Sequence, residues 1–260
     1  MSSLAARLGR SLWTAYEYIA MFAGLGALAL LCLAWLPFAL VCSVLPERVG
    51  RFVGRRVIMI GFRVYLLFLT IFCACRFDLS ALDSLRRERS LVLVANHPSL
   101  LDVVMIVSRL PDAVCVMKAA LMDNILLGAA ARLARYIRND APVSMVRQAR
   151  IALQQGAHLV IFPEGSRTRN FPIDACTGAS GLISQAAKAP LQALVIEFSS
   201  PYLGKSWPLF RKPDLPLRFG IRVGRRFEVP THARRFAREL EDYFRAELSA
   251  DPTHAHNTPS

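Results

Sequence analysis

A histidine and an acidic residue stand five positions apart, directly after a predicted strand. His97 follows the apolar run at residues 91–95, and Asp102 lies five residues further on. In open α/β sheets, ligands bind at the carboxyl ends of strands, so these side chains occupy a place suited to chemistry. A carboxylate beside an imidazole fixes its tautomer and stabilises the imidazolium, which makes the pair a general base. The pattern therefore predicts proton transfer at this strand end.

Part of the same pattern has a purely structural explanation. Ser99 and Asp102 are close to the spacing of a capping box, and Pro98 is typical of a helix start. Asp102 could therefore serve only as a helix cap. The cap leaves His97 unexplained, and the helix start that it predicts would turn Asp102 back toward the imidazole.

A second group of polar residues follows the predicted strand at residues 158–162. It reads Pro-Glu-Gly-Ser-Arg-Thr-Arg, from residue 163 to residue 169. Glu164 and Arg167 could simply form a salt bridge with each other. Alternatively, Gly165 permits close backbone approach and the Arg167 guanidinium offers a bidentate fork to phosphate or carboxylate, which would make an anion site.

Taken together, the two segments resemble sequence blocks of the lysophosphatidate acyltransferase (PlsC-like) family of glycerolipid acyltransferases. Asn-His-Pro-Ser-Leu-Leu-Asp at residues 96–102 is an H-x4-D motif, and Phe-Pro-Glu-Gly-Ser-Arg at residues 162–167 is close to the family's F-P-E-G-[TS]-R block. The resemblance extends from about residue 18 to residue 223, and the order of the blocks is also that of the family.

Weaker blocks depart from the family pattern. Asn139 or Asp140 stands where an arginine is expected, Ala193 replaces a second proline, and Ala175-Cys176 occupies the place of a Phe-Lys pair. These departures keep open an alternative acceptor for the same acyl transfer: another lysophospholipid, an aminolipid or a specialised polyene lipid.

The resemblance implies acyl transfer from acyl-CoA or acyl-carrier protein to the hydroxyl group of a lysophospholipid. The most direct acceptor is 1-acylglycerol-3-phosphate, which would give phosphatidate. His97 would be the general base, oriented by Asp102, and no acyl-enzyme would form. The expected substrate-binding residues are Asn96, Ser99, Arg138, Glu164, Gly165, Ser166 and Arg167.

No metal ion or redox cofactor is expected, because a base and an oxyanion site suffice for this chemistry. The oxyanion would be stabilised by backbone amides at the start of the helix near Ser99 or near Gly165. The cysteines show no CxxC pair, which argues against a zinc site and a disulfide framework. They are Cys32, Cys42, Cys73, Cys75, Cys115 and Cys176.

The elements that must position these residues are predicted from apolar runs that alternate with helical patterns. Strands are expected at residues 91–95, 113–117, 158–162, 192–198 and 217–223, and helices at residues 99–109, 120–135, 142–155, 178–188 and 233–248. Such alternation is typical of an α/β domain with a mostly parallel sheet flanked by helices. We place this domain at residues 79–250 and a disordered tail at residues 251–260.

An apolar N-terminal segment precedes the domain. Residues 18–45 contain no charge, and as a helix they would measure about 42 Å, longer than a hydrocarbon core of about 30 Å. Pro37 is expected to kink or divide this segment, and a second apolar stretch at residues 57–75 carries Arg63, which could snorkel to the headgroups. Residues 1–78 are therefore expected to form a two-helix membrane anchor. A cleaved signal peptide, the alternative, requires a shorter apolar core.

Charge indicates both the partner and the orientation. The chain of 260 residues has a net charge of +13, yet 54% of it is hydrophobic and its mean hydropathy is +0.35. This combination excludes a disordered chain and favours an anionic membrane surface over nucleic acid as the partner. Arginines are more numerous after the first apolar run than before it, so the positive-inside rule places the catalytic domain in the cytoplasm, at the inner membrane. A non-catalytic protein that binds anionic lipid or nucleic acid is the rival class, and it leaves the paired motifs unexplained.

Overall fold

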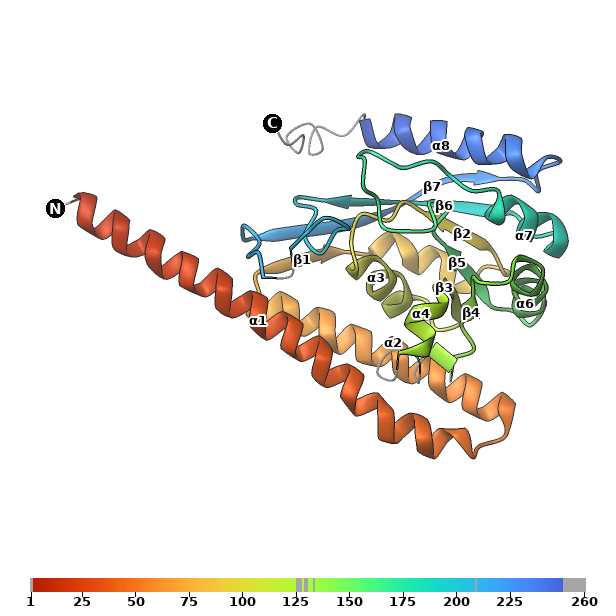
Figure 1. Cartoon of the computed structure of the whole chain (residues 1–260), viewed down its shortest axis with the longest axis horizontal. Helices are drawn as coiled ribbons and strands as arrows, with labels where there is room; N and C mark the ends of the chain where they lie inside the picture. The colour runs from red at the N-terminus through yellow and green to blue at the C-terminus, as the bar shows by residue number, and fades with distance from the viewer. Residues whose placement is uncertain (1, 125–127, 129–130, 133, 209, 250–260) are drawn as a thin grey trace.

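The computed structural model describes residues 2–124, 128, 131–132, 134–208 and 210–249, and in this part of the chain seven strands form one sheet (Figure 1). The order is β1-β7-β6-β2-β5-β3-β4, and every neighbouring pair is parallel except β6 with β7. The expected mostly parallel α/β sheet is thus confirmed. The strands are β1 (Cys75–Asp78), β2 (Val92–Ala95), β3 (Ala113–Met117), β4 (Ile137–Arg138), β5 (His158–Ile161), β6 (Leu191–Phe198) and β7 (Leu217–Phe227).

Helices cover both faces of the sheet. Figure 1 shows α7 and α8 on one side and α3 and α2 on the other. Because helices cover both faces, β2 and β5 are buried along their whole length, as the apolar sequence of each strand requires. The helices of the domain are α3 (Leu101–Arg109), α4 (Ala119–Asp123), α6 (Pro142–Gln154), α7 (Ala179–Ala187) and α8 (Ala233–Ser249), with a 3-10 helix η1 (Ser80–Arg87).

The sheet order brings the two polar segments together. β2 and β5 are parallel neighbours, with Val94 beside Ile161 near their carboxyl ends. The chain leaves β2 into residues 96–100 and leaves β5 into residues 162–168 at the same edge of the sheet. The two polar segments therefore lie side by side at the carboxyl ends of β2 and β5.

The helix expected at residues 120–135 is not continuous. α4 ends at Asp123, and Arg135 has a φ of +58°, in the left-handed region where a helix stops. Residues 125–127, 129–130 and 133 lie outside the described part of the chain. The first break occurs because the backbone of Asn124 is extended, with a ψ of 131°, and the left-handed Arg135 then turns the chain into β4, where Ile137 lies beside Val116.

The N-terminal segment is a single helix, α1 (Ser2–Ser43), that runs through Pro37. The expectation that Pro37 divides it is wrong. A proline removes only one backbone donor, so the helix continues beyond it to Ser43. On the N-terminal side of Pro37 the two helices pack closely, because a Cβ at Gly61 of the next helix would be 3.2 Å from Leu31 and 3.4 Å from Trp35. Within the described residues, only this helix is long and apolar enough to cross a membrane, over Ala6–Ala39.

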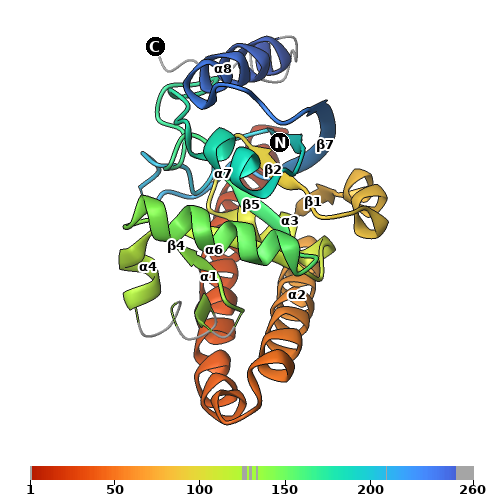
Figure 2. The same cartoon turned by 90° about the vertical axis from the view of Figure 1, so that its right-hand side faces the viewer.

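The second apolar helix, α2 (Glu47–Phe72), is amphipathic. One face packs on α3, where the Arg63 Nε donates to the Ser108 carbonyl at 2.6 Å, so the guanidinium that could snorkel to the headgroups binds protein through this nitrogen. The Arg55 Nε likewise donates to the Ala134 carbonyl at 3.2 Å. The other face exposes large apolar side chains, among them Phe52, Ile60, Val64, Leu67 and Ile71. α1 and α2 thus form a hairpin on the side of the sheet opposite α8 (Figure 2).

The sheet begins slightly before the expected domain boundary at residue 78. β1 pairs in parallel with β7, with Cys75 beside Leu217, so the end of the apolar stretch at residues 57–75 belongs to the sheet. β1 is short and directly follows α2, which hides it in a continuous apolar sequence. The tail expected at residues 251–260 lies outside the described residues.

Candidate active site

His97 and Asp102 form a hydrogen-bonded pair at the end of β2. The His97 Nδ1 lies 2.8 Å from the Asp102 Oδ2, and the Ser99 N–H donates to the same oxygen at 2.8 Å. The Asp102 side chain is 0% exposed and the His97 side chain is 15% exposed. With Nδ1 engaged by the carboxylate, Nε2 is the ring nitrogen left to take up a proton. Both readings of the sequence hold at once: Asp102 binds a backbone amide at the helix start and also binds the imidazole.

The Asp102 carboxyl group is fully buried. Burial raises the pKa of Asp102 above that of an exposed carboxyl group, and the hydrogen bonds with His97 and Ser99 act in the opposite direction. Its Oδ1 is buried and has no hydrogen-bond partner among the described residues.

The imidazole is held by the second motif. The ring of His97 stacks on Phe162, with centroids 3.8 Å apart and an angle of 17° between the planes. The backbone N–H of His97 donates to the Glu164 Oε1 at 2.9 Å, and the backbone carbonyl of His97 accepts from the Thr168 N–H at 2.8 Å. The segments after β2 and β5 therefore interlock around one histidine.

Glu164, expected to bind substrate, has both carboxylate oxygens occupied by protein donors. Oε1 accepts from His97 and from the Thr168 hydroxyl at 3.0 Å, and Oε2 accepts from the Asp174 N–H at 3.0 Å. Burial raises its pKa, and these three bonds oppose that shift. The geometry makes Glu164 a support for the His97 backbone, and the salt bridge with Arg167 is not formed.

Arg167 contacts the connection between β6 and β7. Its Nη1 donates to the carbonyls of Leu203 at 2.7 Å and Gly204 at 3.2 Å. Gly165 has a φ of +69°, which favours glycine, and its N–H closes a turn with the Phe162 carbonyl at 3.0 Å. The Ser166 hydroxyl donates to the carbonyl of Arg167 at 3.2 Å.

Two further predicted residues, Asn96 and Ser99, are buried and paired with backbone. The Asn96 amide donates to the Ile196 carbonyl at 2.9 Å and accepts from the Ile196 N–H at 2.8 Å, so it joins β2 to β6 where the ladder ends. The Ser99 hydroxyl donates to the Tyr202 carbonyl at 2.7 Å and accepts from the Leu101 N–H. Both side chains therefore hold the backbone around His97 in place, and their polar atoms are engaged by other parts of the protein.

Arg138 also pairs with protein. Its guanidinium binds Asp123 through two nitrogens, at 2.6 and 3.3 Å, and binds Asp140 at 2.9 Å. These bonds lower the pKa of both carboxyl groups. The charge of Arg138 is therefore matched by two carboxylates and ties α4 to the end of β4.

Three cations interact electrostatically with Lys205, and of this cluster of four the sequence pattern predicted only Arg167. Lys118 follows β3, Arg167 and Arg169 follow β5, and Lys205 lies in the β6–β7 connection. The pKa of Lys205 is lowered, first by the charge of Lys118 and then by burial and the charges of Arg169 and Arg167. No ion pair joins any of them to a carboxylate within the described residues. The position of Lys118 at a strand end was the available signal.

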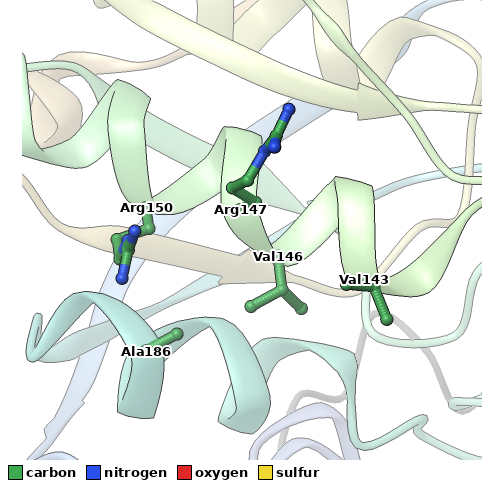
Figure 3. A pocket seen from close by; sticks show the side chains of 5 residues that line it. All are labelled: Val143, Val146, Arg147, Arg150 and Ala186. Carbon is green, nitrogen blue, oxygen red and sulfur yellow. The ribbon is translucent and has the colours of Figure 1, made fainter.

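A small cavity of about 190 Å³ lies between α6 and α7 and includes none of the predicted site residues. Figure 3 shows Val146 directed from α6 toward α7, where Ala186 lies. Its lining consists of Val143, Val146, Arg147, Arg150 and Ala186.

Comparison with known proteins agrees with the geometry. Residues 76–199, which contain both motifs, match the model of the family described as Acyltransferase. Among solved structures, the fold is similar to that of the 1-acyl-sn-glycerophosphate (LPA) acyltransferase PlsC from Thermotoga maritima, with a TM-score of 0.63 over 98% of this chain and 99% of that chain, at 17% identity. Comparison with curated proteins gives no match.

Proposed function

Because residues 76–199 match the model of the acyltransferase family, we propose that this protein is a membrane-associated O-acyltransferase. It moves a fatty acyl group from acyl-CoA or acyl-carrier protein to the free hydroxyl of a lysophospholipid, with 1-acylglycerol-3-phosphate as the first candidate and phosphatidate as the product. The observation that carries the proposal is the His97–Asp102 pair, joined at 2.8 Å at the carboxyl end of β2.

The pair supports direct transfer with a balanced proton path. His97 Nε2 takes the proton of the acceptor hydroxyl while that oxygen forms a bond to the thioester carbonyl carbon. The carbon–sulfur bond of the resulting tetrahedral intermediate then breaks, and His97 returns the proton to the leaving thiolate. Asp102 stabilises the imidazolium between these steps. General base catalysis of this kind contributes roughly 10²- to 10⁴-fold.

Backbone amides after Gly165 are the better candidates for oxyanion donors. The amides of Ser99, Leu100 and Gly165 all donate within the protein. In the described part of the chain, the amides of Ser166 and Arg167 donate to no protein acceptor. An oxyanion needs donors that are free in the resting enzyme, so we assign it to these two amides.

The four cations support an acceptor that carries a phosphate. The side chains of Lys118, Arg167, Arg169 and Lys205 form no ion pair within the described residues, and the charge of Lys118, then burial and the charges of the two arginines lower the pKa of Lys205. Such a cluster gains stability when an anion binds. This chain has Ala175-Cys176 where the family carries a Phe-Lys pair, and the four cations supply positive charge in place of that lysine. The cluster therefore favours lysophosphatidate over an uncharged acceptor.

Membrane association is supported by the exposed apolar surface of α1. Leu8, Leu12, Ile19 and Phe22 are among its exposed side chains. The surplus of arginines after the apolar run of α1 supports the cytoplasmic face of the inner membrane. No redox cofactor or metal ion enters the proposed steps.

The test is acyl transfer by the purified protein in detergent, with labelled acyl-CoA or acyl-carrier protein as donor and a panel of acceptors. We expect transfer to lysophosphatidate, a loss of at least about 100-fold in His97→Ala, and no change in His232→Ala, which removes an exposed histidine of the C-terminal region. Transfer by His97→Ala at the wild-type rate would refute the mechanism. Transfer only to other acceptors would replace lysophosphatidate by the alternative acceptor.

A further inference from the structure

The connection between β6 and β7, residues 199–216, touches the catalytic motif at one end. The Tyr202 carbonyl accepts from the Ser99 hydroxyl at 2.7 Å. The Leu203 carbonyl accepts from the Leu100 N–H at 3.2 Å and from Arg167 at 2.7 Å. Two adjacent carbonyls thus hold both the start of α3 and the guanidinium of the second motif.

This end of the connection has an unusual and crowded backbone. Leu203 has a φ of +58°, a region that L side chains rarely adopt. A Cβ at Gly204 would lie 3.1 Å from the Pro98 carbonyl, so the connection passes close to the residue that follows His97. A conformation of this kind persists only where surrounding contacts hold it.

The other end of the connection is fixed to α1. Glu17, the only acidic residue of α1 and only 4% exposed, forms an ion pair with Lys212 and accepts from the Leu215 N–H at 3.2 Å. The rings of Phe22 and Phe210 lie 6.4 Å apart beside this pair. Lys212 also binds Asp214 at 3.3 Å, but Asp214 is on the outside, with its side chain 93% exposed. A buried carboxylate without a partner is costly, so Glu17 requires the connection to stay in place.

Internal contacts link the two ends. The rings of Tyr202 and Trp207 meet edge to face at 5.7 Å. The Trp207 Nε1 donates to the Arg211 carbonyl at 2.9 Å, and the Arg211 guanidinium lies over the Trp207 ring at 4.7 Å. Lys212 follows directly in the chain. A continuous series of contacts therefore runs from α1 to the residues next to His97.

We propose that Glu17 and Lys212 are positioning residues that act on the active site through this connection. Their ion pair seats the connection on α1, and the seated connection holds Arg167 and the start of α3 in the arrangement that binds the acceptor. The helix that contacts the membrane and the site that receives a lipid are thereby linked. The catalytic consequence rests on the proposed acyl transfer, whereas the structural link does not.

The first experiment compares three variants by hydrogen–deuterium exchange of the full chain without substrate. Lys212→Met breaks the pair, Lys212→Arg keeps it, and Asp214→Asn removes only the exposed partner of the same lysine. We expect Lys212→Met to accelerate exchange in peptides that contain Leu100 and Thr168 while β2 stays protected, and the other two variants to match the wild type. Unchanged exchange at Leu100 in Lys212→Met would overturn the proposal. If Lys212→Met does not fold, Glu17→Gln, which keeps an acceptor for Leu215, takes its place under the same criteria.

The second experiment measures transfer kinetics with the same variants. We expect Lys212→Met to raise the acceptor KM and to lower kcat/KM for the acceptor by roughly ten- to a hundredfold, because small displacements of positioning groups have effects of this size. The donor KM should stay constant, and Lys212→Arg should restore the wild-type values. Equal effects on the donor and acceptor KM would overturn a positioning role toward the acceptor. A wild-type protein that transfers no acyl group would refute the proposed function and leave the exchange experiment as the test of the link.

Discussion

The two carboxylate oxygens of Asp102 differ in their hydrogen bonding, and this difference affects both the stability of the fold and the chemistry of the site. Oδ2 accepts from His97 and from the Ser99 amide, whereas Oδ1 is buried with no hydrogen-bond partner among the described residues. A half-satisfied buried charge destabilises the folded state. Placing this carboxylate beside the imidazole therefore lowers the stability of the fold. Such a loss is expected for a group whose role is catalytic.

Asp102→Asn should remove activity without destabilising the fold at neutral pH. The pKa of Asp102 is raised by burial, so its ionised form costs stability above that pKa and the cost disappears as the group is protonated at lower pH. The stability of Asp102→Asn relative to wild type should thus increase as pH rises from about 4, the ordinary pKa of aspartate, through the raised value. Acyl transfer should fall by several orders of magnitude, as expected when an acid that orients a catalytic histidine becomes an amide. Thermal unfolding in detergent across this pH range, with transfer assays alongside, measures both effects.

Asp123→Asn is the matched control with the opposite sign. The hydrogen bonds from Arg138 lower the pKa of Asp123, so its stabilising contribution is present above the unfolded pKa and is lost as pH falls. This variant should lose stability relative to wild type at neutral pH and match it in acid. The same pH slope in both variants would contradict the assignment of a raised pKa to Asp102.

At the scale of elements, the connection between β6 and β7 depends on Gly204. A Cβ there would lie 2.8 Å from the Pro201 carbonyl and 3.1 Å from the Pro98 carbonyl, and backbone atoms yield little. Gly204→Ala should therefore displace the connection from the residue after His97, lowering stability by about 1–3 kcal/mol and reducing transfer. Gly220→Ala in β7, whose Cβ would meet only ordinary contacts at 3.7 Å, should be close to neutral. Thermal unfolding and transfer rates of the two variants check this, and equal stability of both would show that the close approach is not required.

The sequence predicted those elements whose signal is local. The runs that became β2, β3 and β5 are short and apolar because both faces of a parallel strand are covered, and their ends lie within a residue of the expected positions. β7 continues to Phe227, four residues beyond the expected end. The apolar pattern stops at residue 223 because Gly224 and two exposed arginines follow, so the last part of this strand has no clear local signal. β4 has only two residues and exists because β3 lies beside it, so no local pattern could have predicted it.

The candidate site was predictable only where two residues are close in the sequence. His97 and Asp102 are brought together by the first turn of one helix, and their contact is as expected. Glu164 supports the His97 backbone instead of binding substrate, because it accepts from the backbone amides of His97 and Asp174. Arg167 binds the Leu203 carbonyl, which lies 36 residues further along the chain. The connection between β6 and β7 carries no recognisable motif. Its role follows from the strand order, which residue spacing does not encode.

At the scale of the whole molecule, the contacts of α1 restrict how it can meet a bilayer. The middle of the helix lies against protein: Glu17 binds Lys212, the Ala20 carbonyl accepts from Cys73 at 3.3 Å, and the Gly24 carbonyl accepts from Tyr65 at 3.3 Å. A helix that crosses a bilayer needs about 20 consecutive residues within the hydrocarbon core. In the membrane-bound state that we propose, with the α/β domain in water, these contacts would keep α1 along the membrane surface, with its exposed apolar face in the lipid and its first turns on the side of the domain.

This arrangement predicts that both ends of α1 lie on the cytoplasmic side of the membrane. Arg10→Cys places a thiol near the start of α1, and Asp214→Cys places one on the domain side, with both positions exposed. A membrane-impermeant maleimide should label both variants above the background of the native cysteines in inverted vesicles, and neither in sealed right-side-out vesicles. Labelling of Arg10→Cys from the face opposite to Asp214→Cys would show that α1 crosses the bilayer. Its contacts with Lys212 would then have to open in the membrane, because a helix cannot both span the hydrocarbon core and keep its centre against a domain in water.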